Sequence, residues 1–423
     1  MKYTKKDLGS FNLHLINTDK FKTVTTKIIF HTPIKKEDIT KRNILSDILL
    51  QSSKNYPSKR DLIIKSEDLY AADIYNNNER AGNYILTSFI LQVLNDKYTE
   101  EDNLEEALDF LSEILFNPDI KNNSFNEEKL SLVKNNCKVS LSSIKEDPVN
   151  YAQIRLNEAY DKNSPVSYRM TGYEEDLDKI NTKNLYKYYE NMINNDYVDI
   201  FVVGQIDENK ITDIIKKKFK FRKIKKQKSE YEIDIKKVRS RRLFAKETIE
   251  ASQSKLVIAC PVGKMTKDEK NYALTLANII FGGSVDSKLF KIVREKHSLC
   301  YVIFSSLSKL DNLITIKAGI DKENYLKTVD VITEILDQMK KGKFSEKDVN
   351  MAKEIYISSI NNIEEKPLYL INEYFSEEIT KLDNYQERVA KIKKVTKKDI
   401  IKALKKIKMD TIFLLEGDTK WKK

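Results

Sequence analysis

The chain has 423 residues, of which 40% are hydrophobic and 33% are charged. This length is too great for one hydrophobic core of ordinary size, so we expect more than one domain. The 75 Lys and Arg residues outnumber the 64 Asp and Glu residues, which gives a net charge of +11. No DNA- or RNA-binding signature accompanies this excess, so we do not expect a nucleic-acid partner. The longest basic block, residues 216–228 (KKKFKFRKIKKQK), is more typical of a solvated linker.

Cysteine usage and hydropathy indicate the compartment. Cys137, Cys260 and Cys300 are odd in number, lie far apart and include no C-x-x-C pair. This pattern favours a reducing compartment and disfavours a zinc ribbon. The sequence also has no apolar signal segment and no run approaching the roughly 18 apolar residues of a membrane span. We therefore expect a soluble, cytoplasmic protein without a membrane partner.

Hydrophobic periodicity predicts strands and helices in alternation along the first half. Val24 and Ile28 belong to a β-branched stretch typical of a strand, whereas Ile44, Leu45 and Ile48 recur at helical spacing. The patterns predict strands at 11–17, 23–31, 83–94 and 198–203, and helices at 41–52, 59–70, 103–115 and 126–144.

The second half repeats the pattern of the first. The segment FNEEKLSLVKNNCKVSLSSIKEDP, which begins at Phe125, aligns without gaps with FSEKDVNMAKEIYISSINNIEEKP, which begins at Phe344. Two further segments, KIIFHTP and VDIFVVGQID, have counterparts in KLVIACP and TIFLLEGD. Because the repeat is so long, a solenoid of short units is excluded. We predict an α+β fold with two homologous halves, residues 1–215 and 251–423, joined by a basic linker at 216–250.

Residues 281–301 (FGGSVDSKLFKIVREKHSLCY) combine a glycine turn, an amphipathic helix and a spaced Arg/Tyr pair. Gly282 and Gly283 follow an apolar helical run, where a helix C-cap or a close backbone approach needs residues without a Cβ. Arg294 and Tyr301 stand about two helical turns apart if the helix continues that far. A guanidinium and a phenol at this spacing can reach one bound carbonyl or carboxylate. The alternative is structural, with Arg294 paired to a neighbouring acid and Tyr301 half-buried in a strand.

From end to end, the chain resembles one subunit of the insulinase/pitrilysin/mitochondrial-processing-peptidase family of zinc metallopeptidases. The glycine turn followed by LFKIVREKHSLCY, residues 289–301, is similar to the signature of the C-terminal half in that family. Residues 167–180 (SYRMTGYEEDLDKI) and 198–207 (VDIFVVGQID) support the match in the first half. The resemblance implies that each half is an α/β roll, in which helices cover an antiparallel-rich sheet.

Active members of the family carry an inverted zinc motif, H-x-x-E-H, in which two histidines bind zinc and the glutamate is the general base. In the matching helix of this chain, Asn43 and Asp47 replace the histidines and Ser46 replaces the glutamate. Glu128 is retained on a later helix, and Asn135 stands where the third ligand is expected. The resemblance therefore implies no zinc and no other cofactor on this chain. A hard-ion site at Asp47 and Glu128 is one alternative, and a buried structural role for Glu128 is another.

The histidines lead to the same expectation without the alignment. Only His14, His31 and His297 exist, and no two are close enough in sequence to share a helix face. An Asn/Ser/Asp set offers neither paired imidazoles nor a base with a pKa near neutrality. We therefore do not expect hydrolytic zinc, and we expect His297 to be a surface or capping residue.

The sequence favours a non-catalytic subunit that pairs with a zinc-bearing paralogue, so that zinc is expected only on the partner. The resemblance implies that Arg294 and Tyr301 contact a peptide or small-protein substrate near the scissile bond. Arg294 would hold a substrate carbonyl, and Tyr301 would donate a hydrogen bond to the developing oxyanion. The alternative function is a scaffolding or regulatory protein on a recruited peptidase fold. For that alternative, the resemblance permits a link to modification of elongation factor P.

Overall fold

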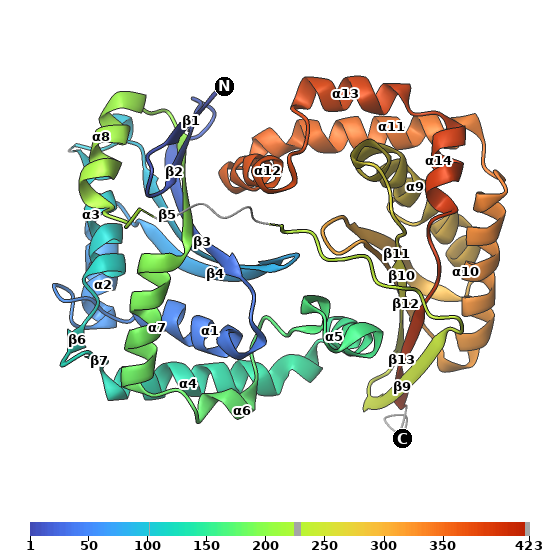
Figure 1. The fold of residues 1–423 in the computed structure, drawn as a ribbon, viewed down its shortest axis with the longest axis horizontal. Coiled ribbons are helices and arrows are strands. Elements are labelled where there is room, and N and C mark those ends of the chain that lie inside the picture. The colour runs from blue at the N-terminus through green and yellow to red at the C-terminus, as the bar shows by residue number, and fades with distance from the viewer. Residues whose placement is uncertain (101, 224–229, 419–423) are drawn as a thin grey trace. The chain divides into compact units, whose positions relative to one another are not determined.

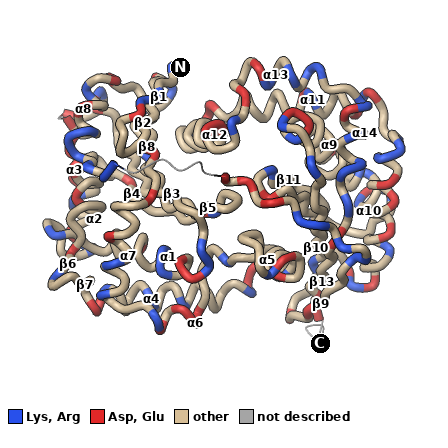
Figure 2. The backbone as a smooth tube through the Cα atoms, in the orientation of Figure 1, with Lys and Arg blue, Asp and Glu red and all other residues tan. Residues whose placement is uncertain are grey.

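The computed structural model describes residues 1–100, 102–223 and 230–418. These residues form two compact units, shown in Figure 1. The N-terminal unit contains residues 1–142, 169–223 and 364–375, and the C-terminal unit contains residues 143–168, 230–363 and 376–418, apart from the undescribed residue 101. Basic and acidic residues are interspersed along both units (Figure 2). None of the helices in the described ranges is long and apolar enough to cross a membrane.

The N-terminal unit is built on a six-stranded sheet with the order β1-β2-β8-β3-β5-β4. β2 and β8 are parallel, and the other neighbouring pairs are antiparallel. The strands are β1 (Lys2–Asp7), β2 (Asn12–Asn17), β3 (Thr23–Pro33), β4 (Asp73–Ala81), β5 (Tyr84–Leu94) and β8 (Tyr197–Gly204). The sequence analysis did not predict β1 and β4, because their residues (KYTKKD and DIYNNNERA) are largely polar.

Helices pack against this sheet around one hydrophobic core, to which α3 and α1 contribute more buried apolar side chains than the other helices do. Helix starts carry the expected capping residues, such as the capping box of Ser58 and Asp61. The helices are α1 (Ile39–Leu49), α2 (Lys59–Asp68), α3 (Asn103–Phe116), α4 (Glu127–Ser142), α6 (Glu174–Leu177), α7 (Thr182–Asn195) and α8 (Glu208–Lys218), with a short β6 (Ile120–Lys121) and β7 (Ser124–Phe125) ribbon.

The C-terminal unit is built on a five-stranded sheet with the order β11-β12-β10-β13-β9. β9 and β13 are parallel, and the other neighbouring pairs are antiparallel. The strands are β9 (Leu243–Glu250), β10 (Ser254–Pro261), β11 (Cys300–Ser308), β12 (Leu313–Ile320) and β13 (Thr411–Asp418). The helices are α5 (Pro148–Asp161), α9 (Leu274–Phe281), α10 (Tyr325–Lys340), α11 (Glu346–Asn361), α13 (Tyr385–Lys394) and α14 (Lys397–Leu404), with π-helical segments at Glu269–Ala273 and Phe290–Lys296.

The two sheets share one topology. The order β2-β8-β3-β5-β4 in the N-terminal unit matches β9-β13-β10-β12-β11 in the C-terminal unit, and in each unit the first two strands of that series form the parallel pair. The predicted α+β fold with an internal duplication is therefore confirmed. α1 follows β3 as α9 follows β10, so these two helices occupy equivalent places.

The compact units do not follow the two halves of the chain. α5 comes from the first half, but it packs on β10 and β13 and belongs to the C-terminal unit. Its counterpart α12 (Pro367–Thr380) comes from the second half, and its residues up to Phe375 belong to the N-terminal unit. The repeated segments end at Pro148 and Pro367, where these helices begin. Each half therefore donates one helix to the other unit.

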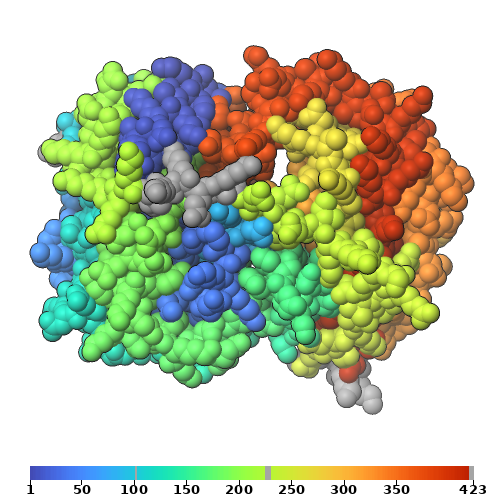
Figure 3. Space-filling view, in the orientation of Figure 1, coloured from blue at the N-terminus to red at the C-terminus, as the bar shows by residue number. Residues whose placement is uncertain are grey.

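The range predicted as a basic linker, residues 216–250, contains regular structure at both ends. α8 continues to Lys218, and β9 occupies Leu243–Glu250 as the first strand of the C-terminal sheet. The sequence of β9 contains no run of apolar residues that would predict a strand, because its residues alternate between half-buried and exposed and none is fully buried. In Figure 3 the yellow-green segment that begins at residue 230 lies on the surface of the C-terminal unit. The end of the basic block, residues 224–228, lies outside the described residues.

Candidate functional site

The degenerate zinc motif lies on α1, in the N-terminal unit, and its polar groups are bound by the protein itself. Asn43 Nδ2 donates to Met170 O at 2.7 Å, and Ser46 Oγ, which is fully buried, accepts from Asn78 Nδ2 at 2.7 Å. Asp47 Oδ1 accepts from Asn76 Nδ2 at 2.9 Å. Burial raises the pKa of the Asp47 carboxyl, and the Asn76 hydrogen bond opposes this rise only in part.

These residues do not fit a zinc ion. Zinc in proteins is held by imidazole, thiolate and carboxylate groups, and the three motif positions supply one carboxylate that is already hydrogen-bonded to an amide. The described residues contain no group of three or more His, Cys, Asp or Glu side chains placed to hold a metal ion. The Asn43 Oδ1 atom is buried and has no hydrogen-bond partner within the described ranges, but an amide oxygen is a poor zinc ligand.

The structure changes the assignment on α4. Glu128 and Asn135 are both exposed, so Glu128 is not a buried structural acid and Asn135 does not face the core. Instead Leu130, Val133 and Cys137 form the inner face at helical spacing, and α4 packs on α1. Burial raises the pKa of the Cys137 thiol, and the nearby Asp47 carboxylate raises it further. The helical phase of the apolar residues would have identified Cys137 as the residue that faces the degenerate motif.

Two histidines that lie far apart in sequence share one buried carboxylate. His14 on β2 and His31 on β3 flank Asp199 on β8, and their Nε2 atoms lie 2.8 and 2.7 Å from its two oxygens. Burial alone would raise the pKa of Asp199, but the hydrogen bonds from both imidazoles hold it far below its usual range. Since each Nε2 must donate to the carboxylate, neither is free to bind a metal ion through that atom.

Aromatic rings pack against the cluster of His14, His31 and Asp199. Tyr3 Oη lies 2.8 Å from His14 Nδ1, and the Tyr3 ring stacks on Tyr374 from α12 with 4.0 Å between centroids. His14 also stacks on Phe201. The cluster therefore has a structural role in holding α12 on the N-terminal unit. The sequence analysis missed it, although a histidine or an aspartate within each of three largely buried strands was a usable signal.

The glycine turn brings α9 and β11 together in the C-terminal unit. Gly282 is the C-cap of α9, and its carbonyl accepts from Ser305 N on β11 at 2.9 Å. A Cβ at Gly282 would lie 2.6 Å from Ser305 Oγ and 2.7 Å from Leu289 Cδ1, so a side chain cannot fit here without displacing them. The position therefore serves both as a helix cap and as a close approach between helix and strand.

Arg294 and Tyr301 are both exposed, but they do not share a helix. The helix ends at Lys296, and Tyr301 lies in β11 as the extra residue of a bulge between Cys300 and Val302. Bulges of this kind re-aim one side chain, and Tyr301 is 66% exposed. The Arg294 guanidinium lies over the Phe290 ring, 4.5 Å from its centroid, and no ion pair with Glu295 is formed in the described structure.

Arg294 and the start of β11 are close to each other. Burial raises the pKa of the Cys300 thiol to about 11, and the positive charge of Arg294 opposes that rise. Tyr301, the residue after Cys300, is exposed, and so is His297, which lies between Arg294 and Tyr301 in sequence. The placement of the guanidinium and the phenol differs from the two helical turns that the spacing suggested, because the helix ends before Tyr301.

Comparisons with known proteins agree with this geometry. Residues 179–356 match a family model described as "Peptidase M16 inactive domain". The chain is 30% identical over 416 residues to "Probable inactive metalloprotease YmfF" of Bacillus subtilis (strain 168), which covers 98% of this chain and 97% of that protein. It is 26% identical over 260 residues to "Uncharacterized zinc protease YmxG" of the same organism, which covers 60% of each chain. Among solved structures, a conserved protein from Enterococcus faecalis V583 superposes with a TM-score of 0.90 at 30% identity and covers 99% of both chains.

Proposed function

Because the chain belongs to the M16 peptidase family, as an inactive homologue of its zinc metallopeptidases, we propose that it is the non-catalytic subunit of a peptide-processing pair. M16 is the insulinase-like family that the sequence resembles. The observation that carries the proposal is the contrast between the two motifs: the side chains at the zinc-motif positions on α1 are hydrogen-bonded to other residues of the chain, whereas Arg294 and Tyr301 stay exposed. Zinc would then be held by a paralogue, and this chain would supply contacts to the substrate in the cytoplasm.

The geometry around β11 supports a peptide as the ligand. β11 is the end strand of its sheet, so its outer edge offers backbone N–H and C=O groups that no other described strand uses. An extended peptide can add to such an edge by main-chain hydrogen bonds. Tyr301 lies at the start of this edge with its side chain turned outward by the bulge, where it could donate to a peptide carbonyl. Arg294 would hold a second carbonyl of the same peptide.

The relatives support a paired arrangement. Bacillus subtilis has both an inactive homologue and a zinc-protease homologue of this chain. A zinc-bearing relative in the same cell would supply the metal and the general base that α1 lacks. On this proposal, the phenol of Tyr301 stabilises the oxyanion that forms on the partner's zinc site, and Arg294 positions the carbonyl before reaction.

The test is a reconstitution. The purified chain, the purified zinc-bearing paralogue and their mixture are assayed on the same quenched peptides. We expect hydrolysis by the mixture, none by this chain alone, and a loss of kcat in the mixture with Tyr301→Phe of up to about 10²–10³-fold, the effect of removing one oxyanion donor. Arg294→Ala should lower kcat/KM as well. Lys296→Ala is the matched control, because Lys296 is exposed on the same helical segment.

The same experiment separates the proposal from a scaffolding role. A scaffold on a recruited peptidase fold, including one linked to elongation factor P, would leave hydrolysis by the paralogue unchanged whether Arg294 and Tyr301 were present or not. Full activity of the mixture with both residues substituted would therefore remove the catalytic part of the proposal.

A further inference from the structure

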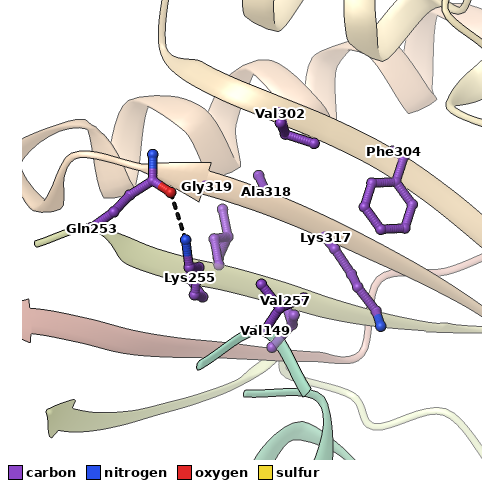
Figure 4. Close-up of a pocket in the computed structure, with 10 residues that line it drawn as sticks. Val149, Gln253, Lys255, Val257, Val302, Phe304, Lys317, Ala318 and Gly319 are labelled. Atoms are coloured by element: carbon purple, nitrogen blue, oxygen red, sulfur yellow. Dashed lines mark hydrogen bonds between the residues drawn. The ribbon is translucent and has the colours of Figure 1, made fainter. Parts of the chain in front are cut away.

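A small apolar pocket lies on the open face of the C-terminal sheet, beside β11 (Figure 4). α5 covers the part of this face formed by β10 and β13, and the pocket lies where that cover ends, next to Val149 in the first turn of α5. Val302 and Phe304 of β11 form one wall and remain 56% and 39% exposed. The volume is about 170 Å³. A cavity of about 150 Å³ can hold a benzene ring, so this pocket can accept one apolar side chain.

Two lysines emerge from the floor of the pocket. Lys255 on β10 is opposite Gly319 on β12, and Lys317 on β12 is opposite Val257 on β10, so the two lysines are diagonal neighbours on one face of the sheet. In Figure 4 their ammonium groups point away from each other, toward opposite ends of the pocket. Each end of an otherwise apolar pocket therefore carries a positive charge.

Neither lysine is neutralised by an ion pair. Lys255 Nζ donates to Gln253 Oε1 at 2.5 Å, and Lys317 makes no hydrogen bond or ion pair with any described residue. Burial lowers the pKa of both ammonium groups, and the charge of Asp147 opposes this fall. Asp147 itself caps α5, where its Oδ1 accepts from Val149 N and Asn150 N. Among the described residues, Asp147 is thus the acid whose charge acts on both lysines, and it forms no ion pair with either of them.

Gly319 keeps the pocket open at the Lys255 end. Gln253 lies directly over it, and a Cβ on Gly319 would come within 2.6 Å of Gln253 Oε1. Gln253 therefore holds Lys255 by a neutral contact, which leaves the ammonium with its charge unbalanced and with donors to spare. An ammonium group that is partly desolvated and lacks an anion binds a carboxylate more strongly than a fully hydrated one does.

Resting on the peptide-binding function proposed above, we propose that this pocket selects acidic peptides: an apolar side chain fills it, and carboxylates on either side of that side chain meet Lys255 and Lys317. Side chains two residues apart project from the same face of an extended chain. A segment of the form acidic–x–apolar–x–acidic that lies over this face of the sheet, beside β11, would therefore place all three groups toward the pocket. The pocket thereby gives the β11 edge, whose main-chain contacts are indifferent to sequence, a preference among peptides.

The test uses the full chain and three labelled nine-residue peptides in fluorescence anisotropy titrations. The first has Glu at both flanking positions and Leu in the centre, the second has Gln in place of each Glu, and the third has Ser in place of Leu. We expect the first peptide to bind most tightly. Lys255→Met and Lys317→Met should each weaken it by about 2- to 5-fold, the effect of one partly exposed ion pair, without changing the affinity of the Gln peptide.

Two further variants keep the result interpretable. Lys317→Arg retains the positive charge and should retain the preference for Glu. Lys327→Met is the matched control, because Lys327 is exposed on α10, which packs on the other face of the sheet, and it should change nothing. Thermal melting of each variant identifies any that fail to fold.

Equal affinity for the Glu and Gln peptides would overturn this inference and leave the proposed function standing. Absence of binding by all three peptides would also overturn it. The proposed function is judged separately, by whether Arg294→Ala and Tyr301→Phe depress hydrolysis in the reconstituted mixture.

Discussion

In the duplicated fold, α1 with the edge strand β4 is equivalent to α9 with the edge strand β11. The two pairs differ in how many side chains of the edge strand bind the helix. In the N-terminal unit, amides of Asn76 and Asn78 on β4 reach across to Asp47 and Ser46 on α1, so the edge strand closes over the helix. In the C-terminal unit, the hydrogen bonds between α9 with its C-cap and β11 all involve Ser305: its Oγ donates to Asn278 Oδ1 at 2.8 Å, its carbonyl accepts from Asn278 Nδ2 at 3.4 Å, and its N–H donates to Gly282 O at 2.9 Å.

β11 buries Cys300 and Ile303 but exposes Tyr301 and the pocket residues Val302 and Phe304. On α1, by contrast, Ser46 and Asp47 are hydrogen-bonded to β4. The difference between the two regions is that Ser46 and Asp47 are hydrogen-bonded to a neighbouring strand, whereas Arg294 and Tyr301 are exposed to solvent. The predictions below test whether the first region is structural and the second is not.

The largest effect on stability is expected at Asp199. Asp199→Ala removes the acceptor for Asn12 Nδ2 and for the Nε2 atoms of His14 and His31. We expect the free energy of unfolding to fall by about 3–5 kcal/mol, because buried donors are left unpaired. Urea denaturation measures this, with Glu128→Gln as an exposed control that should stay within about 0.5 kcal/mol of the wild type.

The effect of Asp199 should also depend on pH. Its pKa in the folded state is depressed, so its contribution to stability is fully present above the unfolded-state value of about 3.9 and is lost as the pH falls toward the folded-state pKa. The stability difference between the wild type and Asp199→Ala should therefore shrink between pH 5 and pH 3. A difference that stays constant over this range would contradict the assigned charge state.

A smaller loss is expected where β4 closes over α1. Asn78→Ala removes the donor to Ser46 Oγ and the acceptor for Thr87 Oγ1. Leaving such buried groups unpaired should lower the free energy of unfolding by about 1–3 kcal/mol. Asn135→Ala, on the exposed side of α4, is the control. Equal stability of the two variants would mean that the hydrogen bonds around α1 are not structural.

A comparable loss is expected at the glycine turn, which joins α9 to β11. Gly282→Ala forces a methyl group against Ser305 and Leu289, and overpacking of this kind costs about 1–3 kcal/mol. Gly263→Ala is the matched control, because a Cβ there would meet its nearest neighbour at 3.4 Å. If Gly282→Ala melts at the wild-type temperature, the close approach of helix and strand is not a constraint.

The smallest effect on stability is expected at Tyr301. Tyr301→Phe removes only an exposed hydroxyl, so the free energy of unfolding should change by less than about 0.5 kcal/mol. The same substitution is expected to lower activity in the reconstituted pair. A destabilisation of the size expected for Asn78→Ala would show that Tyr301 serves the fold, and the contrast between the two regions would then disappear.

Part of this account could be predicted from the sequence. The repeated segments and the strand periodicity indicate the duplication, and the apolar run before Gly282 indicates a cap, because these features depend on local pattern. The carboxylate shared by His14 and His31 depends instead on the strand order β2-β8-β3, which local pattern does not contain. The exchange of α5 and α12 is hidden for the same reason, since it depends on tertiary packing.

At the α1 site, too, part of the structure is visible in the local sequence and part depends on tertiary packing. The Asn, Ser and Asp residues of the motif are visible in the sequence, but the strand that hydrogen-bonds Ser46 and Asp47 is not, because β4 is polar and resembles a loop. Asn135 was placed by alignment, but the helical phase of α4 turns Asn135 toward solvent and Cys137 toward the core. The open face of β11 was equally hidden, since the bulge that exposes Tyr301 follows from register with β12.

The most direct test of the central claim is a metal measurement on the isolated chain. The purified protein is incubated with excess zinc, desalted, and assayed for zinc per chain by plasma mass spectrometry, with Asp47→Ala alongside. We predict far less than one zinc per chain and no difference between the two proteins. One zinc per chain in the wild type that is lost in Asp47→Ala would contradict the account, because α1 would then carry a metal site of its own.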